Sequence, residues 1–174
     1  MTPEFSRPVR LDTIGTAPCR IEIAAQQSER TALAQRFGLI AFDRLEAWAE
    51  ISREGDAVIA VGALEASATQ ACVASGDAVP AEVAEKFALR FIPETNEAPP
   101  EEVELGETDL DEISYSGSSI DLGEAVAQTL ALALDPFPRA PGADAALRAA
   151  GVVGEEDVGP FAALKALKGK LGES

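Results

Sequence analysis

The sequence predicts an α+β domain, and three observations lead to this fold class. Segments 45–52, 57–72 and 83–92 alternate or run apolar in the manner of strands. Short segments containing Gly and Asp separate them, which favours antiparallel pairing. Apolar residues recur at helical spacing over residues 122–134. We therefore expect an antiparallel sheet that could curl towards a barrel, with one helix near residues 29–37 and further helices at the C-terminus.

The N-terminal part predicts two strands and the first helix. Residues 5–14 ("FSRPVRLDTI") and 19–25 ("CRIEIAA") alternate as strands do, and the turn-like "GTAP" separates them. Ser28 stands just ahead of the helical pattern and is a suitable N-cap. The helix is expected to end near Gly38, because glycine readily adopts the left-handed conformation of a C-cap.

The clearest strand signal lies in "LEAWAEIS", whose alternation places Glu46, Trp48 and Glu50 on the face opposite to its apolar residues. "REGD" at 53–56 is a plausible hairpin turn, and "SGDAVP" provides the next turn. Three consecutive strands with short connections predict an antiparallel meander. Four apolar residues share one face of the third strand: Val83, Phe87, Leu89 and Phe91.

A short strand is expected in "DEISY", followed by a helix in "IDLGEAVAQTLALALDPFP". Asp121 can cap this helix, and Glu124 three residues later completes a pattern like a capping box. Both acids also favour the helix dipole. The pair Asp135-Pro136 ends the helix.

We expect two parts: an α+β domain over residues 1–138, containing an acidic, flexible loop at about 94–112, and a helical C-terminal tail over 139–174. Pro160 suits the first turn of a terminal helix. This helix has an apolar stripe of Phe161, Leu164, Leu167 and Leu171. It is too short to be stable alone in water, so it docks either on its own domain or on a partner.

The net charge of −16 is concentrated in one region, since residues 94–124 hold eleven Asp or Glu and no Lys or Arg. Such a region repels a phosphate backbone, because nucleic-acid affinity depends mainly on basic contacts. Two interpretations stay open for the acidic stretch. It is either a solvated loop or a surface that docks onto a basic protein.

The residue types present exclude several kinds of catalytic and metal site. The chain has no histidine, so neither a Cys-His pair nor a Ser-His-Asp triad can form. Phosphate-binding and dinucleotide-binding glycine motifs are absent. Cys19 and Cys72 are too few for a zinc site or a disulfide framework, and we expect both as buried thiols. We expect no enzyme, cofactor or metal, although a hydrolase using carboxylates alone stays an alternative.

The N-terminus lacks the apolar core of a signal peptide, and no apolar run reaches the roughly 20 residues that span a bilayer. We therefore expect a cytoplasmic protein without membrane contact.

Four stretches occur in a characteristic order: "FSRPVRLD", "GALEASATQAC", "IDLGEAVAQTLALALDPFPRAPGAD" after the acidic stretch, and "GPFAALKALKGKLG". In this order they resemble the YceD family, also called domain of unknown function 177, whose members are known as large ribosomal RNA subunit accumulation proteins. The resemblance covers nearly the whole chain and is closest to the alphaproteobacterial branch.

The resemblance also suggests an origin for Cys72. Many family members carry a Cys-x-x-Cys after the long strand and a second cysteine cluster after the helix. Here Cys72 matches the first cysteine, Ser75 stands at its partner position, and residues 138–144 contain no cysteine. Cys72 is then the remnant of a pair. The turn around Ser75, Gly76 and Asp77 would have to hold the loop without metal.

The resemblance implies a non-enzymatic ribosome-biogenesis factor that supports accumulation of 23S rRNA and assembly of the large subunit. The acidic charge favours a basic ribosomal or RNA-processing protein, or a large-subunit precursor particle, as its partner. The sequence does not define an oligomeric state. Candidate partner-binding residues are Asp121, Glu124, Arg139, Pro160, Phe161, Leu164, Leu167 and Lys168.

One alternative function is an acidic adaptor or chaperone for a basic ribosomal protein or RNA-processing enzyme, and three further alternatives stay open. A direct RNA-binding module would need Arg7, Arg10, Arg20 and the C-terminal lysines to form a basic patch. A hydrolase would need two close carboxylates in a pocket, and a nucleic-acid mimic would need evenly spaced surface carboxylates.

Overall fold

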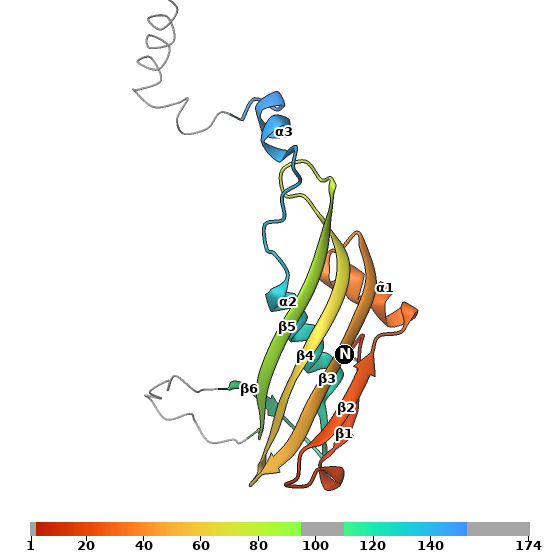
Figure 1. Ribbon diagram of the computed structural model, residues 1–174, viewed down its shortest axis with the longest axis vertical. Coiled ribbons are helices and arrows are strands. Elements are labelled where there is room, and N and C mark those ends of the chain that lie inside the picture. Colours follow the sequence, from red (N-terminus) through yellow and green to blue (C-terminus); the bar gives the residue numbers. More distant parts are fainter. Residues whose placement is uncertain (1–2, 95–109, 153–174) are drawn as a thin grey trace, which may run out of the picture. The chain divides into compact units, whose positions relative to one another are not determined.

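The computed structural model describes residues 3–94 and 110–152 (Figure 1). The expected acidic loop lies mostly, and the terminal helix wholly, outside these residues. The elements are β1 (Pro8–Arg10), the 3-10 helix η1 (Leu11–Thr13), β2 (Cys19–Ala24), α1 (Gln27–Phe37), β3 (Ala41–Glu54), β4 (Ala57–Ala71), β5 (Ala78–Pro93), β6 (Asp111–Tyr115), β7 (Ser119–Asp121), α2 (Leu122–Ala133) and α3 (Ala143–Ala149).

The main sheet has five strands in the order β2-β3-β4-β5-β6, and β1 pairs with β7 in a separate two-stranded sheet. The pairs β2–β3, β3–β4 and β1–β7 are antiparallel. The predicted α+β class and the mostly antiparallel sheet are therefore confirmed. Two differences emerge: the sheet is open, and β6 pairs with β5 in parallel, which the alternation of "DEISY" could not indicate.

The three long strands follow the sequence prediction closely. The turn predicted at 53–56 joins β3 to β4, and Gly55 takes the positive φ of 62° that this turn needs. Gly62 lies opposite Ala49 in the register. A Cβ atom at Gly62 would stand 1.9 Å from the Trp48 carbonyl oxygen, so only glycine fits this close approach.

One face of the sheet carries the core, and α2 lies behind the sheet in Figure 1. The alternating apolar residues of β3, β4 and β5 are buried together with those of α2. Burying each Leu or Phe contributes about 1.5–3 kcal/mol, so this face supplies most of the stability. The largest fully buried side chains are Phe5, Phe91, Leu33, Leu45, Ile51, Leu64, Ile120, Leu122, Leu130, Val58 and Val126.

Helix α1 confirms the predicted helix and its end at Gly38, whose φ is 65°. The predicted N-cap Ser28 is wrong, because the helix begins two residues earlier than expected and Gln26 is the cap. The backbone N–H of Gln26 donates to Glu29 Oε2 at 2.7 Å, which completes a capping box with glutamine at the cap position. The strand predicted over 5–14 is also shorter than expected, since residues after Arg10 form η1.

The chain divides into two compact units, residues 1–70 with 80–136 and residues 71–79 with 137–174. The first contains most of the main sheet, the two-stranded sheet, α1 and α2, and the second contains the turn after β4 and α3. Among the described residues no helix is long and apolar enough to cross a membrane.

Candidate functional site

The N-terminus of α2 holds the N-terminal segment of the chain through Asp121. One carboxylate oxygen accepts the Glu124 N–H at 3.1 Å, which confirms the predicted N-cap, and the Arg7 N–H at 2.8 Å. The other accepts the Ser6 hydroxyl at 2.5 Å. We call these contacts, together with those of Gly123 and Glu124 described next, the clasp.

Gly123 and Glu124 complete the clasp. A Cβ atom on Gly123 would lie 2.5 Å from the Phe5 carbonyl oxygen. The backbone of the N-terminal segment can therefore approach α2 this closely only because residue 123 is glycine. The Glu124 carboxylate does not return to the Asp121 N–H as a capping box would; it pairs with Arg36 at 2.7 Å. Its hydrogen bonds with the guanidinium of Arg36 lower the pKa of Glu124.

A second ion pair fixes the same segment against α1. Arg7 donates from both terminal nitrogens to Glu29, at 2.7 and 2.8 Å, and also to the Ala24 carbonyl. This bidentate geometry lowers the pKa of Glu29. The clasp therefore joins three distant parts of the sequence, and the stretch "IDLGE" supplies its centre. Both Asp121 and Glu124 have partners within the chain, and their role in binding a partner protein stays a prediction.

The turn at Cys72 is closed by backbone and hydroxyl hydrogen bonds. The Cys72 N–H donates to the Asp77 carbonyl and the Gly76 N–H donates to the Cys72 carbonyl, both at 2.8 Å. Ser75 Oγ donates to Asp77 Oδ2 at 2.6 Å, and Gly76 has a φ of 77°. These are the three residues that the sequence singled out to hold the turn. The N–H of Val73 donates to the Pro138 carbonyl, which joins the turn to the chain after α2.

The Cys72 side chain is 3% exposed and lies among hydrogen-bond donors. The backbone N–H of Ala140, the Ser75 hydroxyl and the N–H groups of Ser75 and Ala74 lower the pKa of Cys72 to about 7, because all of them stabilise the thiolate. We call Cys72 with the turn 73–77 and residues 138–140 the thiol turn.

The residues of the thiol turn do not fit a metal ion. One thiol is present, and within residues 3–94 and 110–152 no group of three His, Cys, Asp or Glu side chains is placed to hold one. The expectation that both cysteines are buried is correct for Cys72 and wrong for Cys19, which begins edge strand β2 and is exposed.

The arginines that an RNA-binding patch would need are each paired with an acid. Arg7 binds Glu29, Arg10 binds Asp12 and Arg20 binds Glu22. Arg139, a candidate partner-binding residue, pairs with Asp144 at 2.6 Å at the exposed start of α3. The remaining candidates, Pro160, Phe161, Leu164, Leu167 and Lys168, lie outside the described residues.

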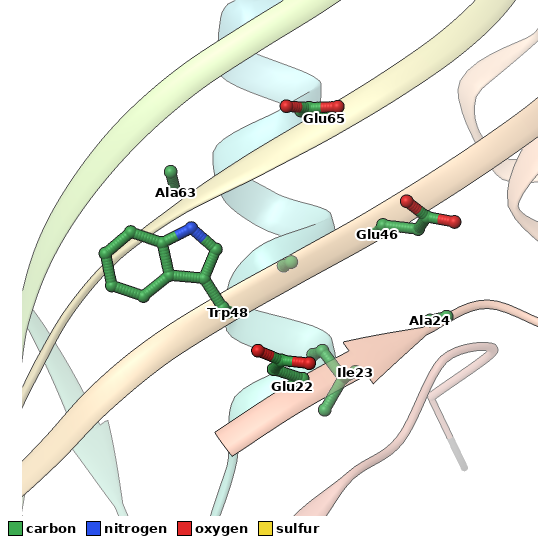
Figure 2. Close-up of a pocket in the computed structure, with 8 residues that line it drawn as sticks. Glu22, Ile23, Ala24, Glu46, Trp48, Ala63 and Glu65 are labelled. Atoms are coloured by element: carbon green, nitrogen blue, oxygen red, sulfur yellow. The ribbon is translucent and has the colours of Figure 1, made fainter. Parts of the chain in front are cut away.

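A hollow of about 360 Å³ lies on the sheet around Trp48, among residues of β2, β3 and β4 (Figure 2). Glu22, Glu46 and Glu65 line it together with Trp48 and Ala63. The sequence analysis placed Glu46 and Trp48 on one face of a strand but did not identify this hollow. The alternation within one strand gives a face, whereas the register between three strands decides which residues meet on it.

The fold and these sites define a small α+β protein with a glutamate-lined hollow on its sheet, a clasped N-terminal segment and no metal-ligand cluster among its described residues. The family model described as large ribosomal RNA subunit accumulation protein YceD matches residues 60–168. The chain therefore belongs to the YceD family, and this membership supports a role in accumulation of the large-subunit rRNA. No curated protein and no solved structure matches the chain.

Proposed function

We propose that this protein is a non-enzymatic ribosome-biogenesis factor in the cytoplasm. It supports accumulation of 23S rRNA and assembly of the large subunit by contacting a basic ribosomal or RNA-processing protein, alone or within a precursor particle. The family match over residues 60–168 is the observation that carries the proposal.

Charge favours a protein contact over capture of bare RNA. The net charge is −16, and Arg7, Arg10 and Arg20 are neutralised by neighbouring carboxylates. A phosphate backbone would therefore meet repulsion at most of the surface, whereas a basic protein would be attracted and steered towards it.

A non-enzymatic role is favoured by the residue types. The chain has no histidine, and apart from the Cys72 thiol the described residues include no buried polar or charged side chain that could act as a desolvated acid or base. The carboxylates whose pKa values are lowered, Asp12, Glu29 and Glu124, are each held by an arginine in a structural contact.

The test is the ratio of large-subunit to small-subunit rRNA in cells depleted of this protein. We expect the large-subunit rRNA to fall and the wild-type chain to restore it. Rescue by a chain ending at Gly159 should be measured at matched protein level, because this chain keeps every described residue and lacks the expected terminal helix. Loss of rescue would assign partner binding to that helix.

A normal rRNA ratio after complete depletion would overturn the proposal for this protein. Binding of isolated large-subunit rRNA fragments, with affinity falling steeply as salt increases, would favour the RNA-binding alternative instead.

A further inference from the structure

The outer face of the sheet forms an ordered array around Trp48. The register places Glu22 of β2 and Ala63 of β4 directly beside Trp48 of β3. In the neighbouring row, Glu46 lies between Ala24 and Glu65. Figure 2 shows Trp48 and the three glutamates on the sheet with α2 behind it. The array is therefore on the face opposite to the core.

Small neighbours leave one side of the tryptophan open. Ala63 is the adjacent residue on β4, and it contributes only a methyl group to the hollow. Trp48 is partly exposed, although it is the largest side chain on this face. A partly exposed tryptophan in a hollow is characteristic of binding surfaces, where such rings supply much of the contact energy.

The molecule itself shows which group the ring accepts. The guanidinium of Arg20 lies 4.3 Å from the centroid of the Trp48 ring, which is a cation–π contact. Arg20 also pairs with Glu22 at 3.0 Å. One guanidinium thus binds the ring and a neighbouring carboxylate together, and the other carboxylates of the hollow extend the same arrangement.

The three carboxylates that line the hollow outnumber the two arginines that pair with them, Arg20 and Arg44. No lysine or arginine of the described residues lines it, whereas Glu22, Glu46 and Glu65 do. Arg44 forms ion pairs with two of these carboxylates, Glu46 at 3.6 Å and Glu65 at 3.1 Å. The side chains of Glu46 and Glu65 are 59% and 60% exposed, so both keep free acceptor capacity. Phosphate is disfavoured here and a cationic side chain is favoured.

We propose that the hollow around Trp48 is the docking site for an arginine-rich segment of a basic protein. One guanidinium of the segment takes the place of Arg20 over Trp48 and on Glu22, and its neighbours bind the free acceptor positions of Glu46 and Glu65. Arginine fits better than lysine, because its planar group stacks on aromatic rings and binds carboxylates in a bidentate manner. This inference rests on the proposed function, since it names the surface that would receive the basic partner.

Trp48 provides the test, because it is the only tryptophan and its fluorescence reports directly on the hollow. The probe is a synthetic peptide that alternates arginine and glycine, titrated into the full-length protein at physiological ionic strength. We expect a saturable change in Trp48 fluorescence. The same peptide with neutral citrulline in place of arginine should give no change.

Charge variants separate the hollow from the overall acidity. The triple variant Glu22→Gln, Glu46→Gln, Glu65→Gln should weaken peptide binding about tenfold. The control variant Glu54→Gln, Glu85→Gln, Glu94→Gln removes the same charge from exposed positions outside the hollow. It should weaken binding less than about threefold, because distant charges are screened at this ionic strength. Equal weakening by both variants would overturn the proposal.

The aromatic contribution is tested by calorimetry with variants that keep the residue apolar. Trp48→Phe retains a ring and should keep most of the affinity, whereas Trp48→Leu should lose about threefold. Unchanged affinity of the leucine variant would overturn the stacking role. A fluorescence change with a single-stranded RNA oligonucleotide, equal to that with the peptide, would overturn the assignment to a basic protein.

The rRNA assay distinguishes this inference from the proposed function. If the hollow variant binds the peptide weakly and yet restores the rRNA ratio fully, the hollow is not the functional surface and the proposed function stands. If depletion itself leaves the ratio normal while the peptide still binds, the proposed function fails and the hollow serves another basic protein.

Discussion

The clasp and the thiol turn both hold segments that are distant in sequence, but they use different chemistry. The clasp depends on side chains: one carboxylate with three donors, one glycine that lets a backbone approach, and one arginine–glutamate pair. The thiol turn depends mainly on backbone N–H groups, which every residue except proline supplies. A clasp residue is therefore hard to replace, whereas most positions of the thiol turn tolerate exchange.

This difference explains how the turn manages with one cysteine. Where the family resemblance implies a second cysteine, Ser75 forms a hydrogen bond to Asp77. The remaining thiol receives N–H donors, so it has partners that do not require a metal. Four variants break or sharpen the comparison, from the largest expected effect to the smallest.

Gly123→Ala should be the most destabilising change, by about 3 kcal/mol, because its Cβ would lie 2.5 Å from a backbone oxygen and 2.9 Å from the Arg7 nitrogen. Chemical denaturation measures the free energy of unfolding. Gly15→Ala is the matched control, since its Cβ would meet nothing closer than 4.0 Å. Equal stability of the two variants would show that the N-terminal segment does not pack on α2.

Asp121→Ala should cost about 2 kcal/mol, because it removes the N-cap and leaves the Arg7 N–H without its acceptor. Asp121→Asn keeps an acceptor for the cap and should recover about half of the loss. Thermal unfolding, analysed with a known enthalpy of unfolding, gives the change in the free energy of unfolding for both variants. If Asp121→Asn loses as much stability as Asp121→Ala, the charge of the carboxylate, and not its hydrogen bonding, provides the stabilisation.

Arg36→Met should cost about 1 kcal/mol, since it breaks partly exposed pairs with Glu124 and Glu4. Its pH dependence is more specific. The folded-state pKa of Glu124 is lowered from the ordinary 4.5, so the pair stabilises fully above that value and is lost as pH falls through the lower folded pKa. The free energy of unfolding, measured from about pH 6 down to about pH 3, should fall less steeply for the variant than for the wild type. This range brackets the ordinary carboxyl pKa values. Arg139→Met, which breaks the exposed pair with Asp144, is the control and should retain the wild-type slope, because a solvent-exposed pair contributes little.

Cys72→Ser should have the smallest effect on stability at neutral pH, because serine also accepts the N–H groups. Its signature is again in the pH dependence. The folded pKa of Cys72 is about 7, below the ordinary 9.0, so the thiolate stabilises the fold fully above pH 9.0 and this contribution is lost as pH falls towards 7.

The wild type should therefore gain stability across this window, and the serine variant should not. Ultraviolet absorbance of the thiolate in a Cys19→Ser background should titrate near pH 7. A midpoint near the ordinary value would contradict the donor arrangement around Cys72.

The sequence predicted the parts of the fold in which local pattern and tertiary packing agree. Alternation in β3 placed Ala49 and Ile51 inside and Trp48 outside, because one face of the sheet is buried against α2. The end of α1 at Gly38 followed from glycine's access to positive φ.

The missed features depend on partners that are distant in the sequence. The parallel pairing of β6 with β5 needs a return of the chain that no local pattern encodes. The donor from Ala140 to the Cys72 thiol comes from beyond α2, and the hollow around Trp48 needs the register of three strands. The Gln26 cap was missed because glutamine is a rare residue at that position.

The clasp also constrains the order in which a newly made chain can complete its fold. Ser6 and Asp121 are 115 positions apart, so the segment around Ser6 cannot dock until the start of α2 has been made. The antiparallel strands β3 and β4 have their pairing partners nearby and can form earlier. During synthesis the segment around Ser6 thus waits longer for its final contacts than β3 and β4 wait for theirs.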